Sequence, residues 1–420
     1  MKRAVVMVID GLRADMVGPE YTPELARIVE RSRWFTNQRS VFPSATRVNS
    51  ASIATGCWPG SHGLAGNAIA LDEGEGLRPV SVGPPDFRDR LRRATGRTLH
   101  RPTLTERLRR HGGAVVYSNS SAGSAHMQDP DSHGWLFHRD GSFAPDMQPI
   151  TGDGHLDVTY DAAGDAVTTD RFCAALEEPG EAKLHLLWIC EPDHSQHTLE
   201  LGGPEHRDVI AGAERCALQV SETVDALRAR GDDVLFVLAS DHGHETVDAI
   251  IPVNELLVEA GHKEHAESSD VVLASSGMGA LVYLSPAAAH RRDAIAEWMR
   301  AQAWAGEVYA GRALEKVGQR SDTALAIAFS MAKRDVANRH GIRGLSHVAG
   351  DVFMKSDAPG HGQHGGLGRY ETNALLAIGG GGFEAGLTEY ASRTIDIAPT
   401  VLRHLGIGGD GMDGAALPMR

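Results

Sequence analysis

Aspartates and histidines occur in this chain in pairs whose spacing suits metal binding. Asp193 and His197 are four residues apart, so on a helical turn both side chains project from one face and reach the same ion. Asp241 and His242 are adjacent, and joint ligation requires the backbone to turn there, which Gly243 permits. A carboxylate paired with an imidazole suits zinc or another first-row divalent ion, so each pair is a candidate metal site.

Two further residues complete a ligand set for two ions. Asp10 follows an apolar run near the N-terminus, and His364 lies in the glycine-flanked segment HGQHGG. Three aspartates and three histidines would give each ion three protein ligands and leave open positions for a substrate. Two ions about 4 Å apart can hold the attacking and leaving oxygens of an in-line displacement. His361, in the same segment, is an alternative to His364.

The segment FPSATRVNSASIATG (42–56) offers a hydroxyl nucleophile, because we expect it to be a loop that enters a helix. Thr46 would lie close to the helix start, where backbone N–H groups and the helix dipole favour a phosphoryl oxygen. A metal ion lowers the pKa of such a hydroxyl, so that it attacks as an alkoxide. Taken alone, however, the segment favours a simpler interpretation in which Thr46 or Ser50 is a helix N-cap.

Buried strands would bring these residues together. Four apolar runs are typical of strands: 4–9, 184–190, 234–240 and 374–380. Four stretches have helical periodicity: 22–33, 103–111, 206–230 and 395–405. This alternation predicts an α/β fold whose mostly parallel sheet is covered by helices on both faces. Ligands of such sheets bind at the carboxyl ends of the strands, where Asp10, Asp193 and Asp241 would lie.

The irregular stretches predict a core with insertions. We assign 1–251 and 361–420 to the catalytic core and 252–360 to a cap or insertion subdomain. Inside the cap we expect a hairpin formed by 271–275 and 280–284, and then a helix near 286–303. Residues 68–165 are rich in Gly, Asp, Ser and Pro, and predict partly irregular insertions.

Composition narrows the class of partner. The net charge of −14 argues against binding of a nucleic-acid polymer, which needs a basic face. We therefore expect a small anionic substrate drawn in by metal ions or a few arginines. No apolar run approaches the roughly 20 residues that cross a bilayer, and the four cysteines form no CxxC pair. These features predict a cytoplasmic protein with reduced cysteines and no membrane contact, and they make no prediction of oligomeric state.

Taken in order, the motifs resemble the alkaline phosphatase superfamily, and above all its branch of nucleotide pyrophosphatase/phosphodiesterases and phosphonoacetate hydrolase. VMVIDGLRAD resembles the first metal-binding strand of that branch, FPSATRVNSASIATG its nucleophile segment and SHGLAGN its HG-x-x-x-N segment. EPDHSQH resembles the D-x-x-x-H pattern, and SDHG and QHGG resemble the remaining ligand segments. The resemblance implies an alkaline-phosphatase-like three-layer sandwich with a mostly parallel central sheet and a smaller cap.

The same resemblance implies a role for each motif. It gives two ligand sets: Asp193, His197 and His364 for one ion, and Asp10, Asp241 and His242 for the other. Thr46 would bridge the ions or bind the second, and would form a phosphothreonine intermediate that water hydrolyses. Asn67 would hold a phosphoryl oxygen, while Arg47 either contacts the leaving side of the substrate or is a solvated helix charge. The implied cofactors are two divalent ions, with Zn²⁺ expected first and Mn²⁺ or Fe as alternatives.

The substrate class is a choice among relatives. We expect a phosphodiesterase or nucleotide pyrophosphatase, with phosphonate C–P hydrolysis as the second hypothesis. Similar phosphonate enzymes use cap lysines, whereas residues 68–182 contain none, so Arg101, Arg107 or Arg139 would have to replace them. The chain has no Cys-x-Pro-x-Arg segment of a sulfatase and no serine nucleophile of a phosphoglycerate mutase. A catalytically inactive binding protein on the same fold is the remaining alternative, which the complete ligand set disfavours.

Overall fold

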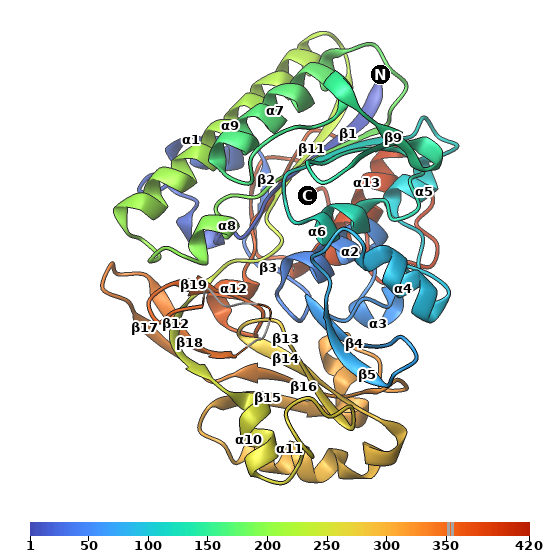
Figure 1. Cartoon of the computed structure of the whole chain (residues 1–420). Helices are drawn as coiled ribbons and strands as arrows, with labels where there is room; N and C mark the ends of the chain where they lie inside the picture. Colours follow the sequence, from blue (N-terminus) through green and yellow to red (C-terminus); the bar gives the residue numbers. More distant parts are fainter. Residues whose placement is uncertain (351–352, 354–356) are drawn as a thin grey trace.

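A large sheet forms the centre of the computed structural model, which describes residues 1–350, 353 and 357–420 (Figure 1). Its strand order is β21-β2-β20-β11-β1-β10-β6-β7-β8-β9. The bounds of these ten strands are β1 (Lys2–Ile9), β2 (Arg33–Phe35), β6 (Ala114–Ser118), β7 (Trp135–Phe137), β8 (Ser142–Ala144), β9 (Gln148–Ile150), β10 (Leu184–Ile189), β11 (Asp233–Ala239), β20 (Leu376–Gly379) and β21 (Gly386–Thr388). β1 pairs in parallel with β10 and β11, and β10 pairs in parallel with β6. β20 runs antiparallel to β11, so the fourth predicted strand ends at the opposite edge from the other three.

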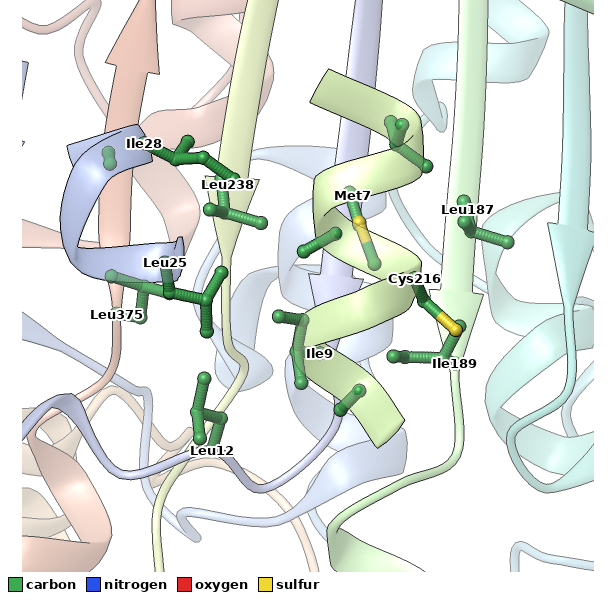
Figure 2. Packing of buried hydrophobic residues seen from close by; sticks show 14 of the residues in the cluster. Met7, Ile9, Leu12, Leu25, Ile28, Leu187, Ile189, Cys216, Leu238 and Leu375 are labelled. Carbon is green, nitrogen blue, oxygen red and sulfur yellow. The ribbon is translucent and has the colours of Figure 1, made fainter. Parts of the chain in front are cut away.

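Alternating side chains of β1 enter two separate hydrophobic cores. Val5, Met7 and Ile9 belong to the core under α1 (Pro23–Glu30), α7 (Ala162–Glu177) and α9 (Pro204–Ala229). Ala4, Val6 and Val8 belong to the core under α2 (Thr46–Thr55), α5 (Leu104–Leu108), α6 (Ala122–Gln128) and α13 (Ile397–Leu405). Figure 2 shows Met7 and Ile9 packed beside Leu187, Ile189 and Leu238 of the neighbouring strands. The predicted helix–sheet–helix layering therefore follows from a central strand that is apolar on both faces.

The register of the central strands sets where their polar ends meet. Ile9 pairs with Ile189, and Val8 pairs with Ala239. The three strands therefore stop nearly level, and Asp10, Asp193 and Asp241 follow them at one edge of the sheet. This is the placement that the sequence pattern predicts.

A second lobe lies below this edge in Figure 1. It contains a four-stranded sheet, in the order β13-β14-β16-β15, and two helices that cover it. The bounds are α10 (Val253–Glu259), β13 (Val271–Ser275), β14 (Gly279–Leu284), α11 (Arg292–Arg300), β15 (Ala305–Ala310) and β16 (Leu325–Met331). The predicted hairpin is confirmed, since β13 and β14 pair antiparallel. The predicted helix at 286–303 is a 3-10 turn over Pro286–Arg291 followed by α11.

A third sheet joins the lobe to the core. Its order is β17-β18-β12-β19, with β12 (Glu245–Ile251), β17 (Lys333–Ala337), β18 (Arg343–Ala349) and β19 (Gly362–Gln363). β12 begins directly after the histidine segment that follows β11. Its partner β18 lies inside the predicted cap, residues 252–360, whereas its partner β19 lies in the predicted core, residues 361–420. Within the predicted insertion 68–165, strands β6 to β9 extend the central sheet. The division into core and cap stays a prediction.

Shorter elements complete the described chain. They are α3 (Pro59–His62), α4 (Phe87–Thr95), α8 (Asp193–Gln196), α12 (Arg369–Thr372), the hairpin β4 (Ala68–Asp72) and β5 (Leu77–Ser81), and the pair β3 (Gln38–Arg39) and β22 (Ser392–Arg393). Five further 3-10 turns lie at Ala14–Met16, Pro145–Met147, Gly152–Gly154, Gly311–Val317 and Thr394–Asp396. The four cysteines are buried and free. Among the described residues, no helix has the length and apolar character needed to cross a membrane.

Candidate active site

The carboxylate of Asp10 is fixed by two hydrogen bonds to one of its oxygens. Ser120 Oγ and Trp188 Nε1 each donate to Asp10 Oδ2 at 2.9 Å. The other oxygen, Oδ1, lies 3.4 Å from Thr46 Oγ1 and 3.6 Å from His242 Nε2. Asp10 therefore turns one constrained oxygen toward the candidate nucleophile.

The helical turn α8 carries Asp193 and, one residue past its end, His197. Glu191 precedes this turn and stabilises it, since its carboxylate accepts hydrogen bonds from the backbone N–H and the hydroxyl of Ser195. The Asp193 N–H donates to Asp10 O at 3.1 Å, which joins this turn to the end of β1. His197 Nε2 lies 3.5 Å from Asp193 Oδ2, so the predicted one-face geometry of the pair is present.

Asp241 and His242 follow β11 and point into the same space. Asp241 Oδ1 accepts from the Gly11 N–H at 3.1 Å, and its Oδ2 lies 3.2 Å from His242 Nε2. We expected Gly243 to permit a sharp turn, but its role is close approach: a Cβ there would lie 2.3 Å from the Tyr370 carbonyl oxygen.

His364 reaches the site from the segment that follows β19. Its Nδ1 lies 2.9 Å from Ser44 O, and because a carbonyl only accepts, Nδ1 carries the proton and Nε2 the free lone pair. His364 Nε2 lies 3.5 Å from Asp193 Oδ1, and its ring stacks on His242 with centroids 3.9 Å apart. His361 lies outside both clusters of candidate ligand atoms.

Thr46 is the first residue of α2 rather than its cap. The N-cap position is held by Ala45, and the Thr46 hydroxyl instead lies 3.0 Å from His242 Nε2. Ser50 is likewise no cap, since its hydroxyl donates to the Ser124 carbonyl. The simpler interpretation of this segment is therefore wrong.

Asn67 and Arg47 flank Thr46 on the side of a small pocket. Asn67 Oδ1 accepts from the Arg47 backbone N–H at 2.9 Å, which fixes the amide and presents its NH₂ group as the remaining donor. Arg47 Nε donates to Ser121 Oγ at 3.2 Å. The pocket holds about 80 Å³ and is lined mainly by polar residues: Arg47, Asn67, Ser81, Ser275, Ser276, Gln363 and His364, with Ala68, Gly277 and Phe353.

The three arginines considered as substitutes for cap lysines are committed elsewhere. Arg139 donates to the carbonyls of Asn119 and Ser120, and its guanidinium lies 3.9 Å from the Tyr160 ring centroid. Arg107 donates to the Asp410 carbonyl, and Arg101 lines a different, open pocket near Trp58. None of the three is among the described residues that line the small pocket, so their role in substrate binding stays a prediction.

Burial and crowding strongly perturb the carboxylates. Burial raises the pKa of Asp10 well above its usual range, and the nearby charges of Asp241 and Asp193 raise it further. Burial also raises the pKa of Asp241, against the opposing effect of His242. Burial acts in the same direction on Asp193, but the imidazoles of His197 and its neighbours outweigh it and hold that pKa well below its usual range. Three carboxylates in one buried space are what a bound cation stabilises.

The residues present fit two metal ions. Ligand atoms within 4.8 Å of one another form two groups: Asp193, His197, His244 and His364, and Asp10, Asp241 and His242. Among the described residues, Asp193 Oδ1, Asp241 Oδ2 and His244 Nε2 are buried without a hydrogen-bond partner. Burial lowers the pKa of His244 to about 4 and that of His364 well below its usual value, so both rings are neutral at pH 7, as metal ligation requires.

Sequence reasoning missed several residues of this site. His244 was not considered as a ligand, although it lies only two residues after His242. Ser120 and Trp188 carry no local signal, because they meet Asp10 only through the pairing of β1 with β10 and of β10 with β6. Glu371 was missed as well: it accepts from Ser44 Oγ and from the N–H groups of Gly366 and Gly368, and so ties together the segments that carry Thr46 and His364.

Comparisons with known proteins identify the family of this chain. A family model described as type I phosphodiesterase/nucleotide pyrophosphatase matches residues 4–315. An uncharacterised pyrophosphatase/phosphodiesterase of Schizosaccharomyces pombe is 24% identical over 249 residues, which are 57% of this chain and 44% of the relative. The chain thus spans less than half the length of the curated relative it matches.

Solved structures share the fold at low sequence identity. Murine ectonucleotide pyrophosphatase/phosphodiesterase 5, as an inactive variant in complex with AMP, is 16% identical with a TM-score of 0.68, over 99% of this chain and 98% of the other. Phosphonoacetate hydrolase of Sinorhizobium meliloti, in complex with phosphonoformate, is 19% identical with a TM-score of 0.68, over 96% of each chain. An alkaline phosphatase, PafA, has a TM-score of 0.73 at 14% identity, over 99% of each chain. The predicted alkaline-phosphatase-like fold is therefore confirmed.

Proposed function

Because this chain belongs to the type I phosphodiesterase/nucleotide pyrophosphatase family, we propose that it hydrolyses phosphodiesters or nucleotide pyrophosphates with Thr46 as nucleophile. The observation that carries the proposal is the position of Thr46 Oγ1, 3.0 Å from His242 Nε2 and 3.4 Å from Asp10 Oδ1, at the first residue of α2. A hydroxyl placed beside a cluster of metal-ligand type, at a helix start, is suited to attack phosphorus.

Two divalent ions belong to this proposal. Asp193, His197 and His364 would hold one ion, and Asp10, Asp241 and His242 would hold the other, with Thr46 beside it. Carboxylate and imidazole donors favour Zn²⁺, with Mn²⁺ and Fe as alternatives. Bound ions would lower the pKa of the Thr46 hydroxyl and offset the negative charge of the phosphoryl group.

The protein side chains position the substrate. We assign the Asn67 NH₂ group to donate to a phosphoryl oxygen, because the Arg47 N–H already occupies its Oδ1. Thr46 Oγ1 gives its proton to solvent and forms a bond to phosphorus as the bond to the leaving oxygen breaks, and the leaving oxygen takes a proton from solvent. Water then attacks the phosphothreonine, the bond from phosphorus to Oγ1 breaks, and the hydroxyl regains a proton.

Cleavage of a small phosphonate is the second candidate, and the size of the pocket supports it. The described residues beside Asn67 enclose about 80 Å³, against the roughly 300–1,000 Å³ of pockets that enclose drug-sized ligands. A carboxylate group fits such a space next to the Arg47 guanidinium, whereas a nucleoside would extend beyond it.

The remaining parts of the proposal concern partners and compartment. We expect a small anionic phosphorus compound as substrate and no nucleic-acid polymer, because the net charge is −14. The four free cysteines support a reducing compartment, and we assign the protein to the cytoplasm on that ground.

Rates on a chromogenic phosphodiester, a chromogenic monoester and phosphonoacetate test the proposal directly. We expect the diester to have the highest kcat/KM, and Thr46→Ala to lower it by at least about 10³-fold because the nucleophile is lost. The matched control is Thr55→Ala, a buried threonine at the far end of α2 whose hydroxyl donates to the Ala51 carbonyl of the same helix.

Mass spectrometry of the acid-quenched reaction should find phosphate on the peptide that contains Thr46. Turnover of phosphonoacetate alone would overturn the first candidate in favour of the second. Full activity of Thr46→Ala would overturn the assigned nucleophile in both.

A further inference from the structure

A third histidine, His244, lies in the cluster around Asp193. We infer that His244 is a direct protein ligand of the ion that Asp193, His197 and His364 hold, so that four protein side chains surround this ion. The inference rests on the proposed two-metal function. It makes the two ions unequal, because only three side chains, besides the nucleophile, surround the other.

The three imidazoles are arranged nearly symmetrically. The ring centroids of His197, His244 and His364 are 5.4, 5.2 and 5.0 Å apart in pairs. With zinc–nitrogen bonds of about 2.0–2.1 Å, three imidazoles at the corners of a tetrahedron have centroids about 5.2 Å apart. His242 departs from this pattern, since its ring stacks on His364 at 3.9 Å.

Asp193 supplies the fourth corner. His244 Nε2 and His364 Nε2 lie 3.2 and 3.5 Å from Asp193 Oδ1, and His197 Nε2 lies 3.5 Å from Oδ2. Neighbouring ligand atoms around a tetrahedral zinc ion are about 3.3–3.4 Å apart. The two separations at Oδ1 match edges of one tetrahedron, and His197 approaches the same carboxylate through its other oxygen.

His244 is held with Nε2 toward this centre. Its Nδ1 lies 3.4 Å from the Gly11 carbonyl, which only accepts, so Nδ1 carries the proton, as in His364 with Ser44 O. The backbone of Gly11 passes so close that a Cβ there would lie 2.7 Å from His244 Cε1 and 2.9 Å from Asp193 Cβ. The ring is fully buried and cannot turn away without displacing Gly11.

A plain hydrogen bond from His244 to Asp193 explains the geometry less well. Nε2 and Oδ1 are 3.2 Å apart, yet neither atom has a hydrogen bond of acceptable angle to any described residue. A histidine whose Nδ1 holds the proton has no N–H at Nε2 to donate. Two lone pairs that face each other across 3.2 Å are suited to share a cation.

Four protein ligands change how the ion behaves. A tetrahedral site with four protein ligands is closed, as in structural zinc sites, whereas three ligands leave a position for water or substrate. We therefore expect the ion at Asp193 to be held more tightly and lost more slowly. The ion at Asp10, Asp241 and His242 would exchange first and would be the one with an open position.

Cobalt substitution in the full-length protein tests this directly. We compare wild type, His244→Ala and His244→Asn with the control His262→Asn. This control removes a histidine outside both ligand clusters, whose ring lies tilted against that of Trp298 with centroids 5.1 Å apart. Each protein is loaded with Co²⁺, its visible absorption is recorded, and its metal content is measured before and after timed exposure to a chelator.

Wild type should bind two equivalents of Co²⁺, show the strong absorption of a four-coordinate ion, and retain one equivalent under mild chelation. His244→Ala and His244→Asn should bind the tight equivalent at least about 100-fold more weakly, since loss of a ligand costs no less than loss of an outer partner. Their absorption should weaken as solvent enters, and added imidazole should restore it in His244→Ala. His262→Asn should match wild type.

Three results would count against these ideas in different ways. Two tightly bound equivalents with unchanged absorption in both His244 variants would overturn the ligand assignment and leave the proposed function standing. The same outcome with lower activity would make His244 a positioning residue only. A wild-type protein that binds no metal would overturn the proposed function, and the inference with it.

Discussion

Removing one hydrogen bond to Asp10 should weaken the metal site without touching a proposed ligand. Ser120→Ala deletes the hydroxyl that donates to Asp10 Oδ2 at 2.9 Å, while Trp188 Nε1 keeps its own bond to the same oxygen. A hydrogen bond to a charged group contributes about 1.5–3 kcal/mol, and about 1.36 kcal/mol corresponds to a tenfold change. We therefore expect the affinity for the ion at Asp10, and kcat/KM with it, to fall by about 10–100-fold.

The second donor gives an internal check. Trp188→Phe preserves the packing of a ring that is almost fully buried and removes only the N–H, so its effect should be of similar size. Both bonds end on one oxygen, so the double variant should deviate from additivity, because residues that share a partner are coupled.

Ser124→Ala is the matched control for these variants. Its hydroxyl is also buried but has no hydrogen-bond partner among the described residues. Metal affinity is measured by competition with a chromogenic chelator, alongside kcat/KM on the diester. If Ser120→Ala and Trp188→Phe both stay within about twofold of Ser124→Ala, the claim that these donors orient Asp10 is refuted.

Three further changes have definite expected outcomes. Asn67→Ala should lower kcat/KM on the diester by about 10–100-fold through loss of a charge-assisted hydrogen bond, and a change below about threefold would contradict its role. Glu371→Ala leaves two buried N–H donors without partners, at a cost of about 1–3 kcal/mol each. Urea unfolding should therefore show lower stability, and metal titration should show weaker binding at the site that contains His364. Wild-type values in both measurements would exclude the role of Glu371 in tying these segments together. Burial raises the pKa of Glu191 from 4.5 to about 7, partly offset by its hydrogen bonds from Ser195, so the folded protein keeps a proton that the unfolded chain releases between those pH values. The contribution of Glu191 to stability should therefore fall by up to about 3 kcal/mol as pH rises from about 4.5 to 7. Urea unfolding of the metal-free protein at pH 5 and pH 8 measures this dependence of stability on pH, and Glu191→Gln should remove it.

The strand ends could be predicted from the sequence because their signal is local. Apolar runs that stop at Asp10 and Asp241 specify both a doubly buried strand and the polar residue at its end. The direction of β20 could not be predicted in this way. Its apolar run resembles the others, and only its pairing with β11 and β2 makes it antiparallel.

The candidate site divides in the same manner. Asp193 and His197 follow from helical spacing, whereas Ser120 reaches Asp10 from 110 positions away along the chain. Arg139 was considered for the substrate because charge is visible in a sequence and its partners are not. In the fold, the carbonyls of Asn119 and Ser120 and the ring of Tyr160 already hold that guanidinium. Pairings over long sequence separations thus decide which polar residues are available.

The central position of β1 has a consequence for how the chain is made. This strand leaves the ribosome before both of its neighbours in the sheet, which begin at Leu184 and Asp233. At roughly 5–20 residues per second, about 10–50 seconds pass before the second neighbour has been synthesised. During that time an apolar strand with two unpaired edges is open to wrong partners. We therefore expect co-translational folding to depend on chaperones that shield this segment. The cluster of Asp10, Asp241 and His242 can form only after His242 has been synthesised, and the cluster around Asp193 only after His364.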